Sequence, residues 1–74
     1  MSNSNSILVF RTSINGKMDV KRVASVLNCY PQITHWSVDL EDWEKVLRIE
    51  CIGISNDELS RVLQNIGIFV KELE

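Results

Sequence analysis

The 74-residue sequence predicts an α+β sandwich with the element order β-α-β-β-α-β. Three observations indicate this fold: four short segments rich in branched and aromatic residues, two segments with a helical stripe of apolar residues, and turn or cap signals between them. A four-stranded antiparallel sheet with both helices on one face would bury both apolar stripes in a single core. This arrangement is the ferredoxin-like sandwich, in which two βαβ halves are joined by a central hairpin.

The first βα unit spans residues 7–27. Residues 7–13, "ILVFRTS", alternate so that Leu8 and Phe10 share one face of a strand. Asn-Gly at 15–16 is a strong turn signal. Beyond it, apolar residues recur at helical spacing and predict a helix with one buried face, made by Val20, Val23, Ala24 and Leu27. Pro31 is expected to stop this helix, because proline lacks an N–H donor and restrains the residue before it.

The middle of the chain predicts an antiparallel hairpin. Residues 33–40, "ITHWSVDL", and residues 46–52, "VLRIECI", both alternate between apolar and polar side chains. The polar turn "EDWEK" joins them and leaves Trp43 exposed. On the second of these strands, Leu47, Ile49 and Cys51 are expected to face the core.

The second helix has a well-marked start and end. Ser55 with Glu58 three residues later forms a capping box, and Ile54 before the cap can pack against Leu59. Gly67 supplies the left-handed residue that ends many helices. Residues 68–73, "IFVKEL", predict the last strand.

Length and composition indicate one domain, residues 7–74, after a flexible polar tail at residues 1–6. The tail lacks the features of a secretory signal, and no apolar run is long enough for a transmembrane helix, so we expect a cytoplasmic protein without membrane contacts. The net charge of −2 argues against nucleic-acid binding. Cys29 and Cys51 are expected to stay reduced.

The loop before the first helix resembles that of heavy-metal-associated domains, the modules of copper chaperones and of the cytosolic tails of metal-transporting ATPases. That family reads Gly-Met-Thr-Cys-x-x-Cys here, with a valine four residues later, and "SINGKMD" at 13–19 followed by Val23 is similar in length and anchoring. Ile14 takes the place of the family's buried methionine. "ITHWSVDL" and "SNDELSRVLQNIGI" resemble the family's second strand and second helix. The two cysteine positions hold Gly16 and Asp19, so the family's metal-carrying role does not transfer and no cofactor is expected.

The remaining metal-ligating and catalytic residue types do not form a recognisable site in the sequence. Copper(I) prefers paired thiolates, but Cys51 is expected in the core, Cys29 near a helix end, and His35 on the opposite face of the sheet. A weak hard-ion site at Asp19, or at the acidic turn residues Glu41, Asp42 and Glu44, is an alternative. With one histidine, no nucleophile elbow and no glycine-rich phosphate loop, the chain is not expected to be an enzyme.

We therefore predict a small binding or interaction module. Basic side chains gather at the start of the first helix, and the resemblance implies docking through this loop and helix, so the partner is expected to be a protein with an acidic surface. The chain itself is expected to be a monomer or a weak dimer. The candidate interaction surface consists of Ile14, Asn15, Gly16, Lys17, Met18, Asp19, Lys21, Arg22 and Trp43.

Two other functions stay open at this point. The first is atypical metal-ion binding or metal trafficking. The second comes from ACT regulatory domains, which share the topology; there a glycine after the first strand lets a small ligand, often an amino acid, sit at a dimer interface. Gly16 lies at roughly that place, which leaves an ACT-like small-ligand role as the third hypothesis.

Overall fold

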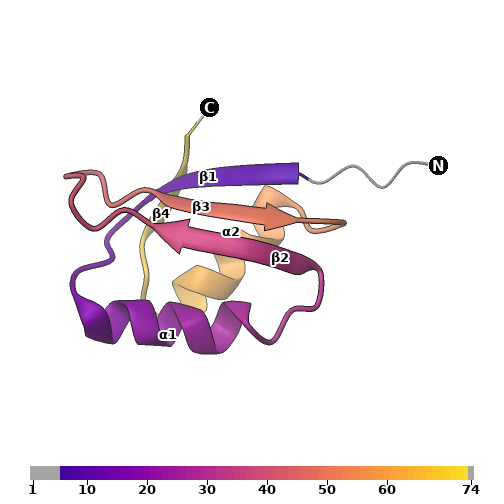
Figure 1. Cartoon of the computed structure of the whole chain (residues 1–74), viewed down its shortest axis with the longest axis horizontal. Helices are drawn as coiled ribbons and strands as arrows, with labels where there is room; N and C mark the ends of the chain where they lie inside the picture. Colours follow the sequence, from indigo (N-terminus) through magenta and orange to yellow (C-terminus); the bar gives the residue numbers. More distant parts are fainter. Residues whose placement is uncertain (1–5, 74) are drawn as a thin grey trace.

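The computed structural model describes residues 6–73, and the predicted order of elements is confirmed (Figure 1). Of the predicted tail at residues 1–6, only Ser6 lies within this range, and it begins the first strand rather than belonging to a tail. The elements are β1 (Ser6–Thr12), α1 (Lys17–Leu27), β2 (Ile33–Val38), β3 (Leu47–Cys51), α2 (Asn56–Asn65) and β4 (Val70–Glu72).

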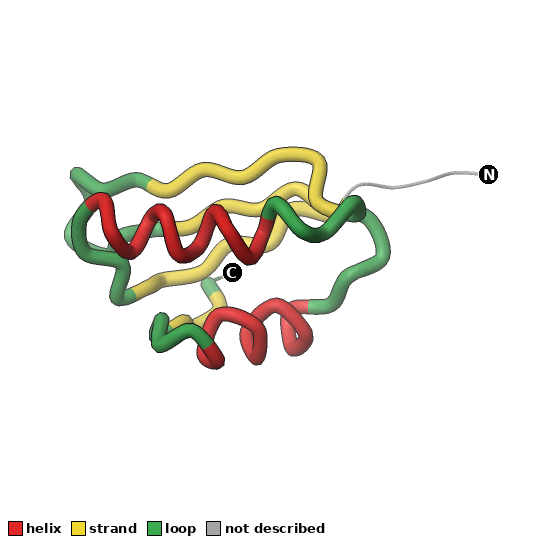
Figure 2. The backbone as a smooth tube through the Cα atoms, turned by 90° about the horizontal axis from the view of Figure 1, so that it is seen from below, coloured by secondary structure: helices red, strands yellow, loops and turns green. Residues whose placement is uncertain are grey.

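The four strands form one antiparallel sheet in the order β2-β3-β1-β4. In the central pair, Phe10 of β1 lies opposite Leu47 of β3, and Leu8 lies opposite Ile49. Both helices cover the same side of the sheet, and β2 is the outer strand on the side away from α2 (Figure 2). This is the predicted ferredoxin-like α+β architecture.

A single apolar core fills the space between the sheet and the helices. The alternation in β3 buries Leu47, Ile49 and Cys51 as predicted, while Arg48 and Glu50 point to the other face. Each helix contributes two fully buried side chains from its predicted stripe. The buried residues that make up the core are Phe10, Ile14, Val23, Leu27, Leu47, Ile49, Cys51, Ile54, Leu59, Leu63, Ile68 and Val70.

The start of α2 confirms the predicted cap. The Ser55 side chain accepts a hydrogen bond from the backbone N–H of Glu58 at 3.2 Å, and Ile54 and Leu59 on either side are buried. At the other end Gly67 has φ +84°, the left-handed conformation that closes a helix.

The ends of β1 and β3 shift by one residue from the sequence-based expectation, and three boundaries differ by more or for a different reason. The first helix ends at Leu27 and is capped by Asn28, so it stops four residues before Pro31, which therefore does not terminate it. β2 ends at Val38 because Asp39 starts a side-chain turn, in which its carboxylate accepts the N–H of Glu41 at 3.1 Å. β4 begins only at Val70, because the N–H of Ile68 is still bonded to the carbonyl of Leu63 at the end of α2.

Candidate functional site

Three connecting segments meet at one end of the sheet: residues 13–16 between β1 and α1, residues 39–46 between β2 and β3, and residues 66–69 between α2 and β4 (Figure 1). The N–H of Thr12 donates to the carbonyl of Glu44 at 3.2 Å. The N–H of Ser13 donates to the carbonyl of Phe69 at 3.0 Å, and the N–H of Phe69 donates to Ser13 Oγ at 2.9 Å. We call these three segments, together with the first turn of α1, the loop end.

Thr12 fixes the point at which the chain leaves β1 for this loop. It is the buried polar side chain among the described residues, with 7% of its surface exposed. Its hydroxyl donates to the carbonyl of Lys45 at 2.5 Å and accepts the N–H of Ile14 at 3.2 Å. Because the hydroxyl both donates and accepts, these hydrogen bonds compensate for its burial, and it holds two of the three segments together.

Gly16, at the position of the family's first cysteine, has a backbone conformation that a cysteine would not adopt. Its φ is +87° and its ψ is −179°, a region that is populated almost entirely by glycine. No atom lies within 4 Å of the place where a Cβ would be, so glycine is required by the backbone angles and not by a close neighbour. The observed path of the loop therefore requires glycine at position 16.

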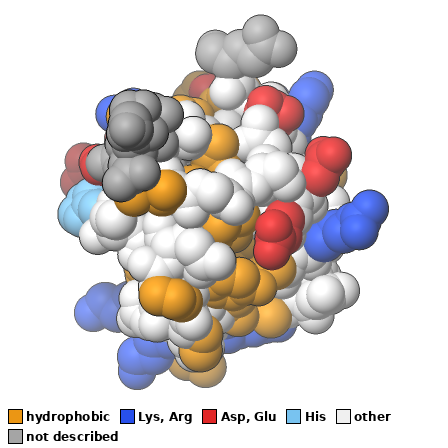
Figure 3. All heavy atoms as spheres, turned by 90° about the vertical axis from the view of Figure 1, so that its right-hand side faces the viewer, with side chains coloured by type: hydrophobic (Ala, Val, Ile, Leu, Met, Phe, Trp, Pro, Cys, Tyr) orange, Lys and Arg blue, Asp and Glu red, His pale blue; other side chains and the backbone are white. Residues whose placement is uncertain are grey.

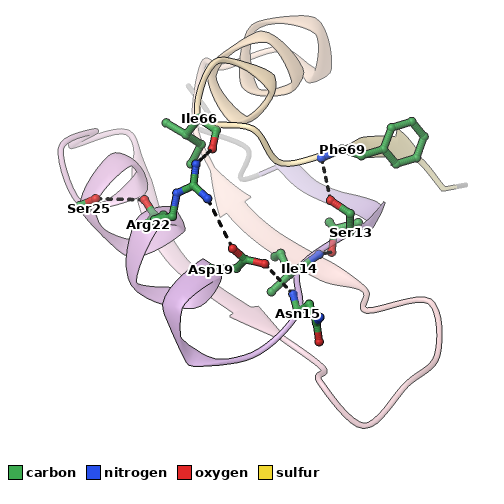
Figure 4. A network of polar contacts seen from close by, with 9 residues as sticks. Ser13, Ile14, Asn15, Asp19, Arg22, Ser25, Ile66 and Phe69 are labelled. Carbon is green, nitrogen blue, oxygen red and sulfur yellow. Dashed lines mark hydrogen bonds and ion pairs between the residues drawn. The ribbon is translucent and has the colours of Figure 1, made fainter.

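Asp19, at the position of the second cysteine, makes contacts within the protein with both carboxylate oxygens (Figure 4). Oδ2 accepts the N–H of Asn15 at 2.9 Å, and Oδ1 lies 3.5 Å from Nη1 of Arg22. Gly16 caps α1 without a side-chain hydrogen bond. Asp19 in the first turn instead reaches back to the N–H of Asn15 before the cap, and its negative charge lies at the favourable end of the helix dipole.

Arg22 extends this network from α1 to the end of α2. Its Nη2 donates to the carbonyl of Ile66, next to Gly67 (Figure 4). A Cβ at Gly67 would lie 3.2 Å from Nη2 of Arg22, so glycine here serves both the helix end and this contact. Asp19 and Arg22 thus join two of the three segments of the loop end through side chains.

Large apolar side chains surround the loop end and are exposed to solvent. Met18 in the first turn of α1, Trp43 in the hairpin and Phe69 before β4 have 72%, 75% and 61% of their surface exposed. The predicted exposure of Trp43 is confirmed, and the structure supplies a contact for it, because the guanidinium of Arg11 lies 4.7 Å from its ring centre. Arg11 also lies 3.9 Å from the carboxylate of Glu44, which fixes the stack beside the hairpin.

Most of the predicted interaction residues are accessible in the structure, with one correction. Asn15, Gly16, Lys17, Met18, Lys21, Arg22 and Trp43 are exposed, and Asp19 is partly exposed. Ile14 is fully buried in the core, so its side chain cannot belong to an interaction surface. Its side chain instead belongs to the apolar core.

Two contributors to the loop end were missed in the sequence. Phe69 is exposed because Ile68 and Val70 on either side face the core, and this alternation was available in "IFV". Arg11 could not be paired with Trp43 from sequence alone, because the contact depends on how the hairpin folds back over β1.

The two thiols and the histidine lie in different environments. Cys51 is fully buried, and burial raises the pKa of its thiol, an effect that the backbone of Ile54 partly offsets. Cys29 is exposed beyond α1 and donates to the carbonyl of Ser25 at 3.2 Å, while His35 is exposed on β2. Within residues 6–73, no three His, Cys, Asp or Glu side chains are placed together as metal ligands would be.

A shallow open hollow lies beside the hairpin, next to the loop end. Its walls carry both signs of charge, from Arg48 of β3 and from two aspartates of the connecting segment. Both aspartates already accept a backbone N–H two residues further along, which holds the turn in shape. The lining residues are Ser37, Asp39, Asp42, Val46 and Arg48.

The opposite end of the molecule is different in character. Figure 3 shows hydrophobic side chains between uncharged surface there, with acidic and basic side chains around the rim. The network of Figure 4 and the exposed Met18, Trp43 and Phe69 are features of the loop end, which makes that end the better candidate for contacts with other molecules.

Comparison of the chain with family models, with characterised proteins and with solved structures gave no match. In the part of the chain that the structure describes, neither helix has the length and apolar character needed to cross a membrane.

Proposed function

We propose that this chain is a small non-catalytic interaction module of heavy-metal-associated type, without the family's metal cysteines, that binds a protein partner through its loop end. The observation that carries the proposal is the group of exposed side chains there: Met18 and Trp43, which are largely exposed, beside Lys17 and Lys21. We further propose that it acts in the cytoplasm, with both thiols reduced.

The proposed kinship rests on the anchors of the loop and not on its ligands. Ile14 and Val23 are buried where the resemblance puts a buried methionine and valine, and two residues, Asn15 and Gly16, separate Ile14 from the start of α1. Gly16 and Asp19 have conformational and hydrogen-bonding roles of their own, so loss of the thiolates has left an ordered loop. Such a loop can present a fixed surface without a metal ion.

The charges favour a partner with carboxylates around an apolar contact. Within the described residues, the ion pairs involve Arg11 with Glu44 and Arg22 with Asp19. Lys17 and Lys21 are exposed on α1 and take part in neither pair, so their charges remain available for an acidic partner. Methionine and tryptophan are well suited to the apolar part of such a contact.

The test is an amide NMR titration with a synthetic peptide that alternates glutamate and leucine. We expect shifts concentrated at residues 15–22 and at the Trp43 indole, weakening as salt is raised. K17E/K21E should abolish these shifts, whereas R61E on α2, a charge reversal away from the loop end, should leave them in place. Equal losses in the two variants, or shifts spread over the whole chain, would contradict the proposal.

A second candidate, the binding of a small zwitterion such as an amino acid, is favoured by the hollow beside the hairpin. Arg48 could donate hydrogen bonds to a ligand carboxylate, and Asp39 or Asp42 could accept them from a ligand ammonium group. A thermal-shift screen with the twenty amino acids would support this candidate if one of them stabilised the wild type but not R48Q. Atypical metal binding is tested by amide NMR, in a titration with copper(I) and zinc(II) under reducing conditions. Binding would shift the amide signals of residues 13–22.

A further inference from the structure

Within residues 6–73, no strand pairs with the outer edge of β2. β2 is the outermost strand next to β3, and none of its six residues is buried (Figure 2). The strand contains no proline and no lysine, glutamate, aspartate or arginine. The other edge, β4, has only three residues, and two of them, Lys71 and Glu72, are charged. Short, charged edges resist pairing with another strand, so β2 is the edge open to it.

The hydrogen bonds of the hairpin show which groups of β2 face outwards. The N–H of Asp39 donates to the carbonyl of Val46 at 2.9 Å, and the same register places Ser37 opposite Arg48. Because bonding direction alternates along an antiparallel strand, Ser37 and Asp39 turn their backbone groups towards β3. Trp36 and Val38 therefore direct their N–H and C=O groups to the free edge.

We propose that the free edge of β2 pairs antiparallel with β2 of a second copy of this chain, about a two-fold axis at Ser37. In this register Trp36 of each copy lies opposite Val38 of the other, and these two pairs supply four backbone hydrogen bonds. Ser37 faces its own counterpart as a close pair without backbone bonds between them. The two sheets then join into one, with the helices of both copies on the same side.

The side chains of β2 are complementary in this register on both faces. On the core side, Trp36 and Val38 are only partly buried in one copy, and each would cover the other's exposed part. On the open face, His35 of one copy lies opposite Asp39 of the other, twice, which brings a basic group to an acidic one. Pairing about Trp36 would instead oppose the two indoles and draw in the irregular step between Ile33 and His35.

Cysteine cross-linking tests both the pairing and its register. In a C29S background, S37C should form a disulfide-linked dimer on mild oxidation, because the Cα atoms of such a pair lie about 4.5 Å apart. H35C is the matched control, since two residues that are offset by four positions are about 13 Å apart along the strands, beyond the reach of a disulfide. Cross-linking of S37C but not of H35C supports the proposal, whereas equal yields, no cross-linking, or preferential cross-linking of H35C would overturn it.

The mass of the unmodified protein gives the second test. Sedimentation equilibrium from micromolar to millimolar protein should show the wild type shifting reversibly to twice the monomer mass. S37E places two glutamates opposite each other across the two-fold axis, so it should raise the dissociation constant at least about fivefold. Within one copy the new glutamate lies opposite Arg48, so the monomer should stay folded. S25E on the exposed side of α1 adds the same charge and should leave the dimer intact. A wild type that stays monomeric at millimolar concentration would overturn the proposal.

Discussion

Asp19 shows how a single carboxylate can order the loop ahead of a helix. Its carboxylate bonds the N–H of Asn15 ahead of α1 and pairs with Arg22 one turn later, while Arg22 reaches the carbonyl of Ile66. In a metal-carrying loop, two thiolates and an ion would hold the corresponding positions together. In this chain, hydrogen bonds and an ion pair hold the loop to both helices.

Removing the Asp19 carboxylate should therefore loosen the loop. We expect D19A to lower the free energy of unfolding by about 1 kcal/mol, since it leaves the Asn15 N–H without its acceptor and removes the ion pair with Arg22. D57A is the matched control, because Asp57 lies in the first turn of α2 and shares the favourable helix-dipole position. Urea denaturation of the two variants separates the loop contact from the dipole effect; equal losses would mean that Asp19 acts through the dipole alone.

Introducing a pair of cysteines into the loop should carry a cost at Gly16. A cysteine at φ +87° and ψ −179° is strained by about 1–3 kcal/mol, so G16C should be destabilised even though no atom obstructs its side chain. The double variant G16C/D19C should bind copper(I) only with a rearranged backbone at residues 15–19. Copper(I) titration with amide NMR checks this: metal uptake with unchanged amide shifts outside the two cysteines would contradict it.

The two thiols should differ sharply in reactivity. Cys29 is exposed, whereas Cys51 is buried and its thiol pKa is raised, so a disulfide reagent at neutral pH should label Cys29 promptly and Cys51 only when the chain opens. The raised pKa also means that above the ordinary thiol pKa of 9.0 the unfolded chain loses the Cys51 proton before the folded one does. Stability should then fall as the pH rises. Mass spectrometry of the labelled native wild type measures the difference in reactivity. The pH dependence of unfolding, compared between C29S and C29S/C51A, measures the contribution of Cys51 to stability.

At the scale of elements, local sequence signals fixed the helices and strands, and tertiary contacts set their ends. The apolar stripes and the Ser55 cap predicted both helices, because these features depend on neighbours within one turn. The limits of β2 and β4 were wrong by two residues, because they depend on a side-chain turn at Asp39 and on the closing bonds of α2. Contacts such as Arg11 with Trp43 or Arg22 with Ile66 join distant segments, and periodicity carries no information about them.

The cap of α2 can be tested within one helix. S55A removes the acceptor for the Glu58 N–H and should cost about 1 kcal/mol of unfolding free energy. S60A makes the same chemical change in the interior of α2, where alanine is the better helix former, and should be neutral or slightly stabilising. Thermal and urea unfolding of the two variants compare them directly; a loss in S60A as large as in S55A would show that the cap is not the cause.

At the scale of the whole molecule, the same loop serves the core and the surface, and Ile14 and Met18 separate the two roles. Ile14 is fully buried and Met18 is 72% exposed, although they are only four positions apart in the sequence. A domain of this length has about 4–11 kcal/mol of total stability, and truncation of a buried isoleucine costs about 2–5 kcal/mol. I14A should therefore unfold at markedly lower urea, whereas M18A should change stability by less than about 0.5 kcal/mol.

The same pair of variants should behave in the opposite way in peptide binding. Without urea and at low temperature, the folded fraction of I14A should keep its affinity for the acidic peptide, because the Ile14 side chain is fully buried and does not contribute to the surface. M18A should lose affinity while remaining as stable as the wild type, since it removes exposed apolar area that a partner would cover. If M18A binds normally, the apolar contact lies elsewhere on the loop end, and W43A and F69A, which truncate its other two exposed side chains, identify which of them makes it.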